Sequence, residues 1–80
     1  MKVYIVACHG NEKFYGAVGV FVIGAFTDFR SACKCAIRVV EDELFSRDDV
    51  YVEVFDGDNG APVDMWRYHN IIDKRLSICD

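Results

Sequence analysis

The chain has 80 residues, of which 52% are hydrophobic and 14% aromatic, and this apolar content excludes an intrinsically disordered chain. The longest apolar run, residues 17–26, is about half of the roughly 20 residues that a membrane-spanning helix needs. The first residues lack the pattern of a secretory signal. We therefore expect a single cytoplasmic domain over residues 1–80, with no membrane contact and with its four cysteines reduced.

The net charge of −4 is unevenly distributed along the chain. Residues 1–40 contain five basic and two acidic residues, whereas residues 41–80 contain four basic and eleven acidic ones. A surface that binds a nucleic-acid duplex gathers several cations, and no segment here does so. We expect no direct binding to nucleic acid.

Two strands are predicted in the N-terminal third. Residues 2–8 are rich in Val, Ile and Tyr and run into His9-Gly10-Asn11, which is typical of a strand that enters a turn. Residues 14–26 are apolar at both alternating sets of positions. That pattern indicates a central strand covered on both faces.

A helix is predicted next, with Thr27 as its N-cap and Asp28 in its first turn. Its apolar positions recur every three or four residues, which indicates one buried stripe. Residues 46–49 are expected to end it. The stripe consists of Ala32, Cys33, Ala36, Ile37, Val40 and Leu44.

A hairpin follows, with strands over residues 50–55 and 63–69 joined by a turn rich in Gly, Asp and Asn. The tail, residues 71–80, fits either a helical turn or a short strand, and we favour the strand. The fold class is therefore α+β: a small antiparallel sheet with one helix packed on one face, in the order β-β-α-β-β with the tail left open. One helix leaves the other sheet face uncovered, so a homodimer or a protein partner should cover it.

No catalytic or metal-binding pattern stands out. Cys8 and His9 are adjacent, but neighbouring strand residues point to opposite faces. The turn at Asp56 lacks the glycine and the closing glutamate of a calcium loop, and the Cys and His spacings are not those of zinc ligands. We expect no enzyme, no cofactor and no metal ion; a zinc- or thiol-dependent domain is the third alternative.

Acidic and aromatic residues around the hairpin are the expected partner-binding residues. Carboxylates attract a basic surface, including the nucleic-acid groove of another protein, and aromatic rings anchor interfaces. The alternatives are scattered solvating acids and rings that belong to the core. The expected residues are Glu53, Asp56, Asp58, Asp64, Trp66 and Tyr68.

Residues 2–55 resemble a loose family of small bacteriophage proteins. The resemblance rests on Lys2-Val3-Tyr4-Ile5-Val6, on Ile23-Gly24-Ala25-Phe26-Thr27 and on the spaced alanines of residues 30–37. Members of that family share a β-β-α-β core whose second strand closes on Gly-x-Phe-Ser/Thr. The four cysteines and the acidic, aromatic C-terminal third depart from the pattern. The resemblance carries no catalytic or ligand residues.

The resemblance implies a viral accessory protein, of a kind that often inhibits a host enzyme or defence complex, CRISPR effectors included. The first functional hypothesis is therefore a non-enzymatic, inhibitor-type protein in the host cytoplasm that binds a basic site on a host protein. The alternative is a homodimeric interaction module whose doubly apolar sheet is buried between two copies.

Overall fold

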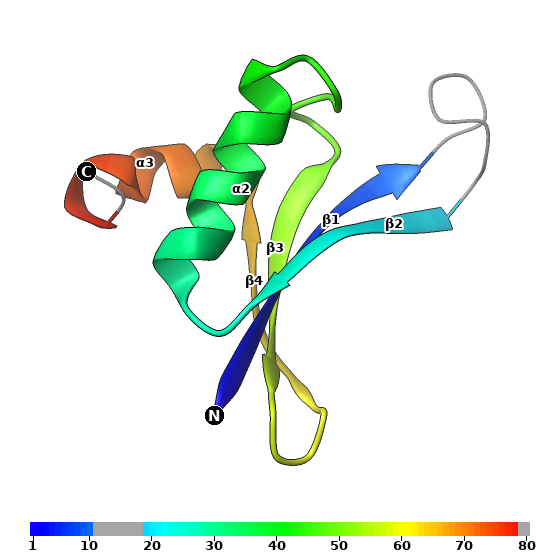
Figure 1. Cartoon of the computed structure of the whole chain (residues 1–80), viewed down its shortest axis with the longest axis vertical. Coiled ribbons are helices and arrows are strands. Elements are labelled where there is room, and N and C mark those ends of the chain that lie inside the picture. The colour runs from blue at the N-terminus through cyan, green and yellow to red at the C-terminus, as the bar shows by residue number, and fades with distance from the viewer. Residues whose placement is uncertain (11–18, 79–80) are drawn as a thin grey trace.

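A computed structural model describes residues 1–10 and 19–78, the last five of them by backbone alone. Four strands form an antiparallel sheet in the order β2-β1-β3-β4, and both helices lie on one side of it (Figure 1). The predicted α+β class and the helix on the sheet are confirmed. The elements are β1 (Lys2–Gly10), β2 (Gly19–Phe26), α2 (Phe29–Glu41), β3 (Val50–Asp56), β4 (Pro62–Arg67) and α3 (Tyr68–Ile78).

β2 is an edge strand, whereas the sequence predicted a central one. Its position follows from the pairing, because β1 lies between β2 and β3. Val6 pairs with Gly24 and Ala7 with Val22, so Ile23 is an extra residue in β2. Such a bulge blunts a free edge against further strand pairing. Residues 14–18 of the predicted strand lie outside the described residues.

α2 begins one residue later than predicted, because Asp28 and not Thr27 is its N-cap. The Oδ1 of Asp28 accepts a hydrogen bond from the backbone N–H of Ser31 at 2.8 Å. The helix ends at Glu41, and Glu43 then takes the left-handed conformation with φ 60°. That turn removes Leu44 from the predicted buried stripe, and Leu44 is 62% exposed.

The tail is a helix, which corrects the predicted strand. β4 ends at Arg67, so Tyr68 opens α3 and does not belong to the return strand. Tyr68 and Ile71 are three residues apart, which places them on one side of a helix. Both are buried in the core, and their burial explains why a helix replaces the weak strand pattern. Residues 79–80 of the tail lie outside the described part of the chain.

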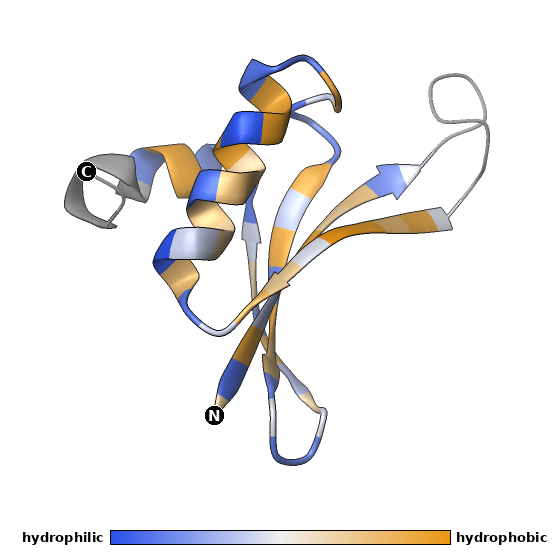
Figure 2. Ribbon diagram, viewed as in Figure 1, coloured by the Kyte–Doolittle hydropathy of each residue, from blue (hydrophilic) through white to orange (hydrophobic). Residues whose placement is uncertain are grey.

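The core lies between the sheet and the two helices. Core-facing strand residues alternate with residues on the other sheet face, and α2 contributes small and branched apolar side chains, as the mixed colouring of that helix reflects (Figure 2). None of the described polar or charged residues is buried. The core cluster consists of Val6, Cys8, Ala32, Cys33, Ala36, Ile37, Val50, Val52, Tyr68 and Ile71.

Candidate functional site: an uncovered sheet face

The sheet face opposite the helices is covered by no described element (Figure 1). The strand pairing and the alternation of side chains assign its residues, since Ile5 lies beside Ala25 and Glu53 while Ala7 lies beside Val22 and Tyr51. We call it the open face. It consists of Val3, Ile5, Ala7, His9, Val20, Val22, Ala25, Tyr51, Glu53, Phe55, Met65 and Arg67.

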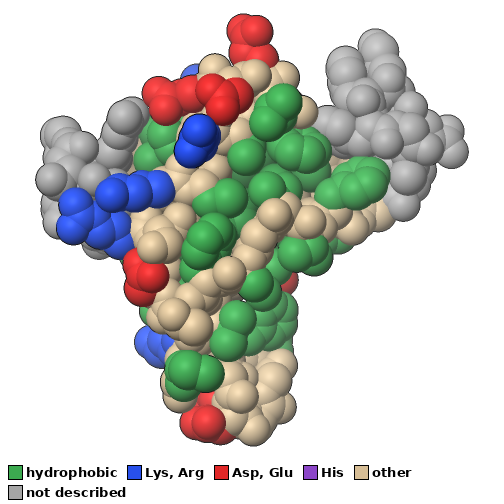
Figure 3. Space-filling view, viewed as in Figure 1, with side chains coloured by type: hydrophobic (Ala, Val, Ile, Leu, Met, Phe, Trp, Pro, Cys, Tyr) green, Lys and Arg blue, Asp and Glu red, His purple; other side chains and the backbone are tan. Residues whose placement is uncertain are grey.

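The open face is mainly apolar and most exposed at its two edge strands. Val20 and Val22 on β2 are 57% and 68% exposed, and Met65 on β4 is 44% exposed. Val3, Ile5 and Phe55 on the central strands are half-buried. In Figure 3, drawn in the orientation of Figure 1, hydrophobic side chains gather in the middle of the view around α2 and β2, and most acids lie towards its margins. An apolar sheet surface of this kind is typical of an interaction site.

Charge is sparse and mixed on the open face. Glu53 is half-buried on β3, and Arg67 lies on β4 opposite Tyr51. Neither forms an ion pair with a residue that the structure describes. The rings of His9 and Tyr51 are stacked, with centroids 4.8 Å apart and planes 29° apart. Burial, helped by the nearby Glu53 and Cys8, raises the pKa of Tyr51, so the phenol stays neutral at physiological pH.

The predicted partner-binding acids do not form one surface. Glu53 is on the open face, whereas Asp64 is opposite Val54 and therefore on the helix side of the sheet. Asp56 accepts a hydrogen bond from Asp58 N–H at 2.8 Å, and Asp64 accepts one from Met65 N–H at 2.8 Å. The Asp58 carboxylate lies 3.3 Å from the N-terminal amine of Met1. The hairpin acids thus help to build the turn and to pin the N-terminus.

The two predicted aromatic anchors face the core. Tyr68 is only 7% exposed, so its ring is not offered to a partner in this structure. Trp66 is half-buried, with its ring 5.1 Å from that of Phe29. Beside it lies a shallow pocket of about 190 Å³, which is lined by Lys2, Tyr4, Phe29, Val54, Asp64 and Trp66.

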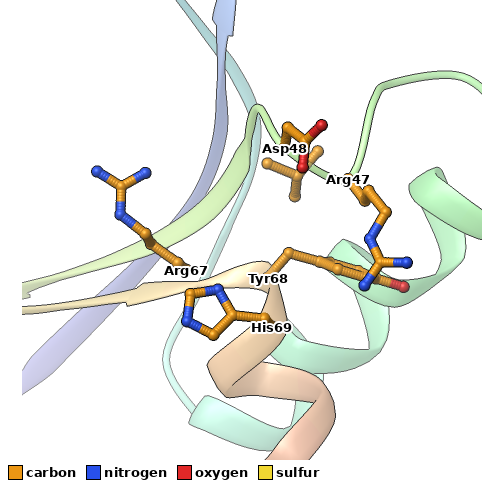
Figure 4. A pocket seen from close by; sticks show the side chains of 6 residues that line it. Arg47, Asp48, Arg67, Tyr68 and His69 are labelled. Carbon is orange, nitrogen blue, oxygen red and sulfur yellow. The ribbon is translucent and has the colours of Figure 1, made fainter.

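A second pocket, of about 210 Å³, lies where β4 passes into α3 (Figure 4). The Arg47 guanidinium lies over the Tyr68 ring, 5.8 Å from its centroid. Arg67 extends from the opposite side and points away, so the two guanidinium groups do not converge on one point. Sites for drug-sized ligands measure about 300 to 1,000 Å³, which is larger than either pocket.

The described cysteines are placed as small hydrophobic residues. Cys8 and Cys33 are fully buried and Cys35 is half-buried, and none of these three is in a disulfide. Burial, reinforced by the charge of Asp49, raises the pKa of Cys8. Within residues 1–10 and 19–73, no three His, Cys, Asp or Glu side chains gather closely enough to hold a metal ion. None of the described helices is long and apolar enough to cross a membrane.

Comparisons of this chain with protein-family models, with curated proteins and with solved structures find no match. The resemblance to bacteriophage proteins therefore stays a prediction. The open face itself had a sequence signal, because Val3, Ile5 and Ala7 are apolar although they alternate with the core residues Val6 and Cys8. Which strands join it depends on strand order, which the sequence left undetermined.

Proposed function

We propose that this protein is a non-enzymatic interaction module that docks its open face against a polypeptide surface. The observation that carries the proposal is the four-stranded sheet with helices on one side and exposed Val20, Val22 and Met65 on the other. Covering such side chains contributes about 25 cal/mol per Å² of apolar surface removed from water. A flat apolar sheet fits another protein better than it fits a small ligand.

A pull-down that compares the wild-type protein with a lysine variant of the open face tests this function. Val22→Lys places a charge on the β2 side of the open face, at a position that is already 68% exposed, so folding should be little affected. Leu44→Lys is the matched control, because Leu44 is 62% exposed and lies between α2 and β3, outside the sheet. Immobilised wild-type protein and Leu44→Lys should retain the same polypeptide, either another protein or this chain, and Val22→Lys should lose it.

The proposal is rejected if all three proteins retain the same polypeptides equally, or if none retains any. Circular dichroism of each variant shows whether the fold is intact. If the predicted resemblance to phage proteins holds, a bacterial host supplies the partner, so bacterial lysate is the first source of partners to test.

A second candidate function is the inhibitor-type binding of a basic host protein at the hairpin end. It is favoured by the position of Asp56 and Asp64, which lie on the same side of the hairpin near the exposed Asp58. Replacing all three by Asn removes charge but keeps an oxygen that accepts the turn hydrogen bonds. Loss of a salt-sensitive partner in the triple variant supports this function, and retention of every partner contradicts it.

A further inference from the structure

We infer that the polypeptide that covers the open face is a second copy of this chain, stacked sheet against sheet across a two-fold axis. The inference rests on the proposed function and names the partner. Three properties of the open face support a second copy: the area of the face, its charge, and the positions of Glu53 and Arg67.

The area of the open face suits a small dimer interface. Four strands about 4.8 Å apart and roughly seven residues long give a flat area of about 450 Å². That is below the roughly 600 to 800 Å² per partner of small specific interfaces, and Ala7 and Tyr51 within the face are already buried, so the contact is a small one. A contact of this size is consistent with a dimer of micromolar Kd.

The charge of the open face favours self-association over a strongly charged partner. The protein carries a net charge of −4, yet the open face holds one carboxylate, one guanidinium and one imidazole. Two copies therefore approach each other on nearly neutral surfaces, while their acidic hairpin and α2–β3 segments stay outside. A basic partner gains little here, because Glu53 is the only acid among the described residues of this face.

Glu53 and Arg67 give the contact its specificity. A half-buried carboxylate that becomes covered needs a cation, since an unpaired charge in an interface is strongly destabilising. In a two-fold contact, residue i of one copy meets residue j of the other and the reverse also holds. If Glu53 of one copy meets Arg67 of the second copy, the two-fold axis therefore creates the same pair a second time, and both carboxylates are neutralised.

The resulting assembly has four layers, helices–sheet–sheet–helices, with the two sheets about 10 Å apart as in other face-to-face packings. The small, exposed side chain of Ala25 on β2 gives room for Val22 or Met65 of the opposite sheet to interdigitate. Edge-to-edge pairing through β2 is disfavoured, because the bulge at Ile23 breaks the row of backbone donors and acceptors along that strand.

Sedimentation equilibrium over concentrations of about 1 to 500 μM tests the inference. The wild-type protein should change from monomer to dimer in this range. Val22→Lys should raise the dimer Kd at least about tenfold, whereas Leu44→Lys should leave it within about twofold. A wild-type chain that stays monomeric at 500 μM overturns the inference, and so does a dimer that Val22→Lys does not weaken.

Charge exchange tests the pairing. Glu53→Arg and Arg67→Glu should each raise the dimer Kd about tenfold or more, because each places like charges together in both halves of the contact. The double variant restores opposite charges and should return the Kd to within about threefold of wild type. A double variant as weak as the two single variants overturns the assignment of Glu53 to Arg67.

The outcomes separate this inference from the proposed function. If the wild-type protein is monomeric but a different polypeptide binds it and is lost on Val22→Lys, the second copy is the wrong occupant and the interaction module stands. If it is monomeric and no polypeptide depends on Val22, both are wrong.

Discussion

The ring of Phe29 at the start of α2 packs on the ring of Trp66 in β4, with centroids 5.1 Å apart and planes 48° apart. Tyr4 of β1 adds a second contact, 5.7 Å from Phe29. One side chain therefore ties the helix to a central strand and to the edge strand beyond β3. No other pair of described rings links α2 to β4 in this way.

Phe29→Ala should lower the free energy of unfolding by about 2 to 3 kcal/mol, less than the roughly 3 to 5 kcal/mol of a fully buried Phe because Phe29 is half-buried. Trp66 is the only tryptophan of the chain, so its fluorescence reports the urea transition directly. A double-mutant cycle with Trp66→Leu, followed by circular dichroism, should give a coupling of about 0.5 to 1.5 kcal/mol. Additive effects would show that the ring contact itself contributes nothing.

Ile71→Ala should lower the free energy of unfolding by about 2 to 4 kcal/mol, because Ile71 is fully buried and joins α3 to the core. Ile72→Ala is the matched control, because Ile72 is only half-buried and its truncation removes less buried apolar surface. Urea unfolding followed by Trp66 fluorescence measures both. Equal losses in the two variants would mean that α3 does not dock through Ile71.

The N-cap of α2 should make stability depend on pH. The backbone N–H of Ser31 donates to Asp28 and holds the pKa of that carboxyl below its ordinary value of 3.8. A lowered folded-state pKa means that the contribution is fully present above the unfolded-state value and is lost as the pH falls through the folded-state value. The difference in urea midpoint between wild type and Asp28→Ala should therefore be constant from pH 7 to about 5 and shrink below pH 4.

Asp28→Asn is the control for this prediction, because Asn caps a helix as well as Asp but does not titrate. Its urea midpoint should lie near that of the wild type at pH 7. A difference between wild type and Asp28→Ala that stays constant down to pH 2 would contradict a role for the charged cap.

The sequence predicted the hairpin turn and the buried side of α2 correctly, because both are set by residues close together in the chain. The hairpin turns at residues 56–60 as predicted, and the Gly60 N–H donates a hydrogen bond to the Asp56 carbonyl oxygen. Such a turn is predictable because Gly and Asn tolerate its backbone conformations in any context. The stripe of α2 was correct through Ile37, because helical periodicity records which side is buried. Leu44 broke the pattern because the left-handed Glu43 ended the helix before it.

Features that depend on contacts between distant segments were not predictable. The position of β2 at the edge is set by β3 pairing with the other side of β1, and no local pattern encodes that choice. The burial of Tyr68 and Ile71 depends on where α2 lies, so the tail looked ambiguous by itself. The sequence predicted that one side of the sheet would be uncovered, because some strand residues are apolar on both faces. Which residues belong to the open face could be assigned only from the strand register in the structure.

Thiol reactivity should follow burial. Burial raises the pKa of Cys35 and of Cys8, which lowers the fraction of reactive thiolate at neutral pH, and Cys8 and Cys33 are also closed to solvent. In a Cys79→Ser background, which removes the one cysteine outside the described residues, the native protein should react with a disulfide reagent first at half-buried Cys35. Cys8 and Cys33 should react at least about tenfold more slowly, at the rate of global or local opening.

Replacing Cys35 by Ser should abolish the fast phase and leave the two slow ones, and 6 M urea should make all remaining thiols equivalent. The rate at Cys35 should still rise with pH above 8, because a raised pKa moves thiolate formation to higher pH. Labelling of Cys8 as fast as Cys35 in the native protein would mean that β1 opens from the sheet far more readily than its full burial implies. Mass spectrometry of peptides after timed alkylation distinguishes these outcomes.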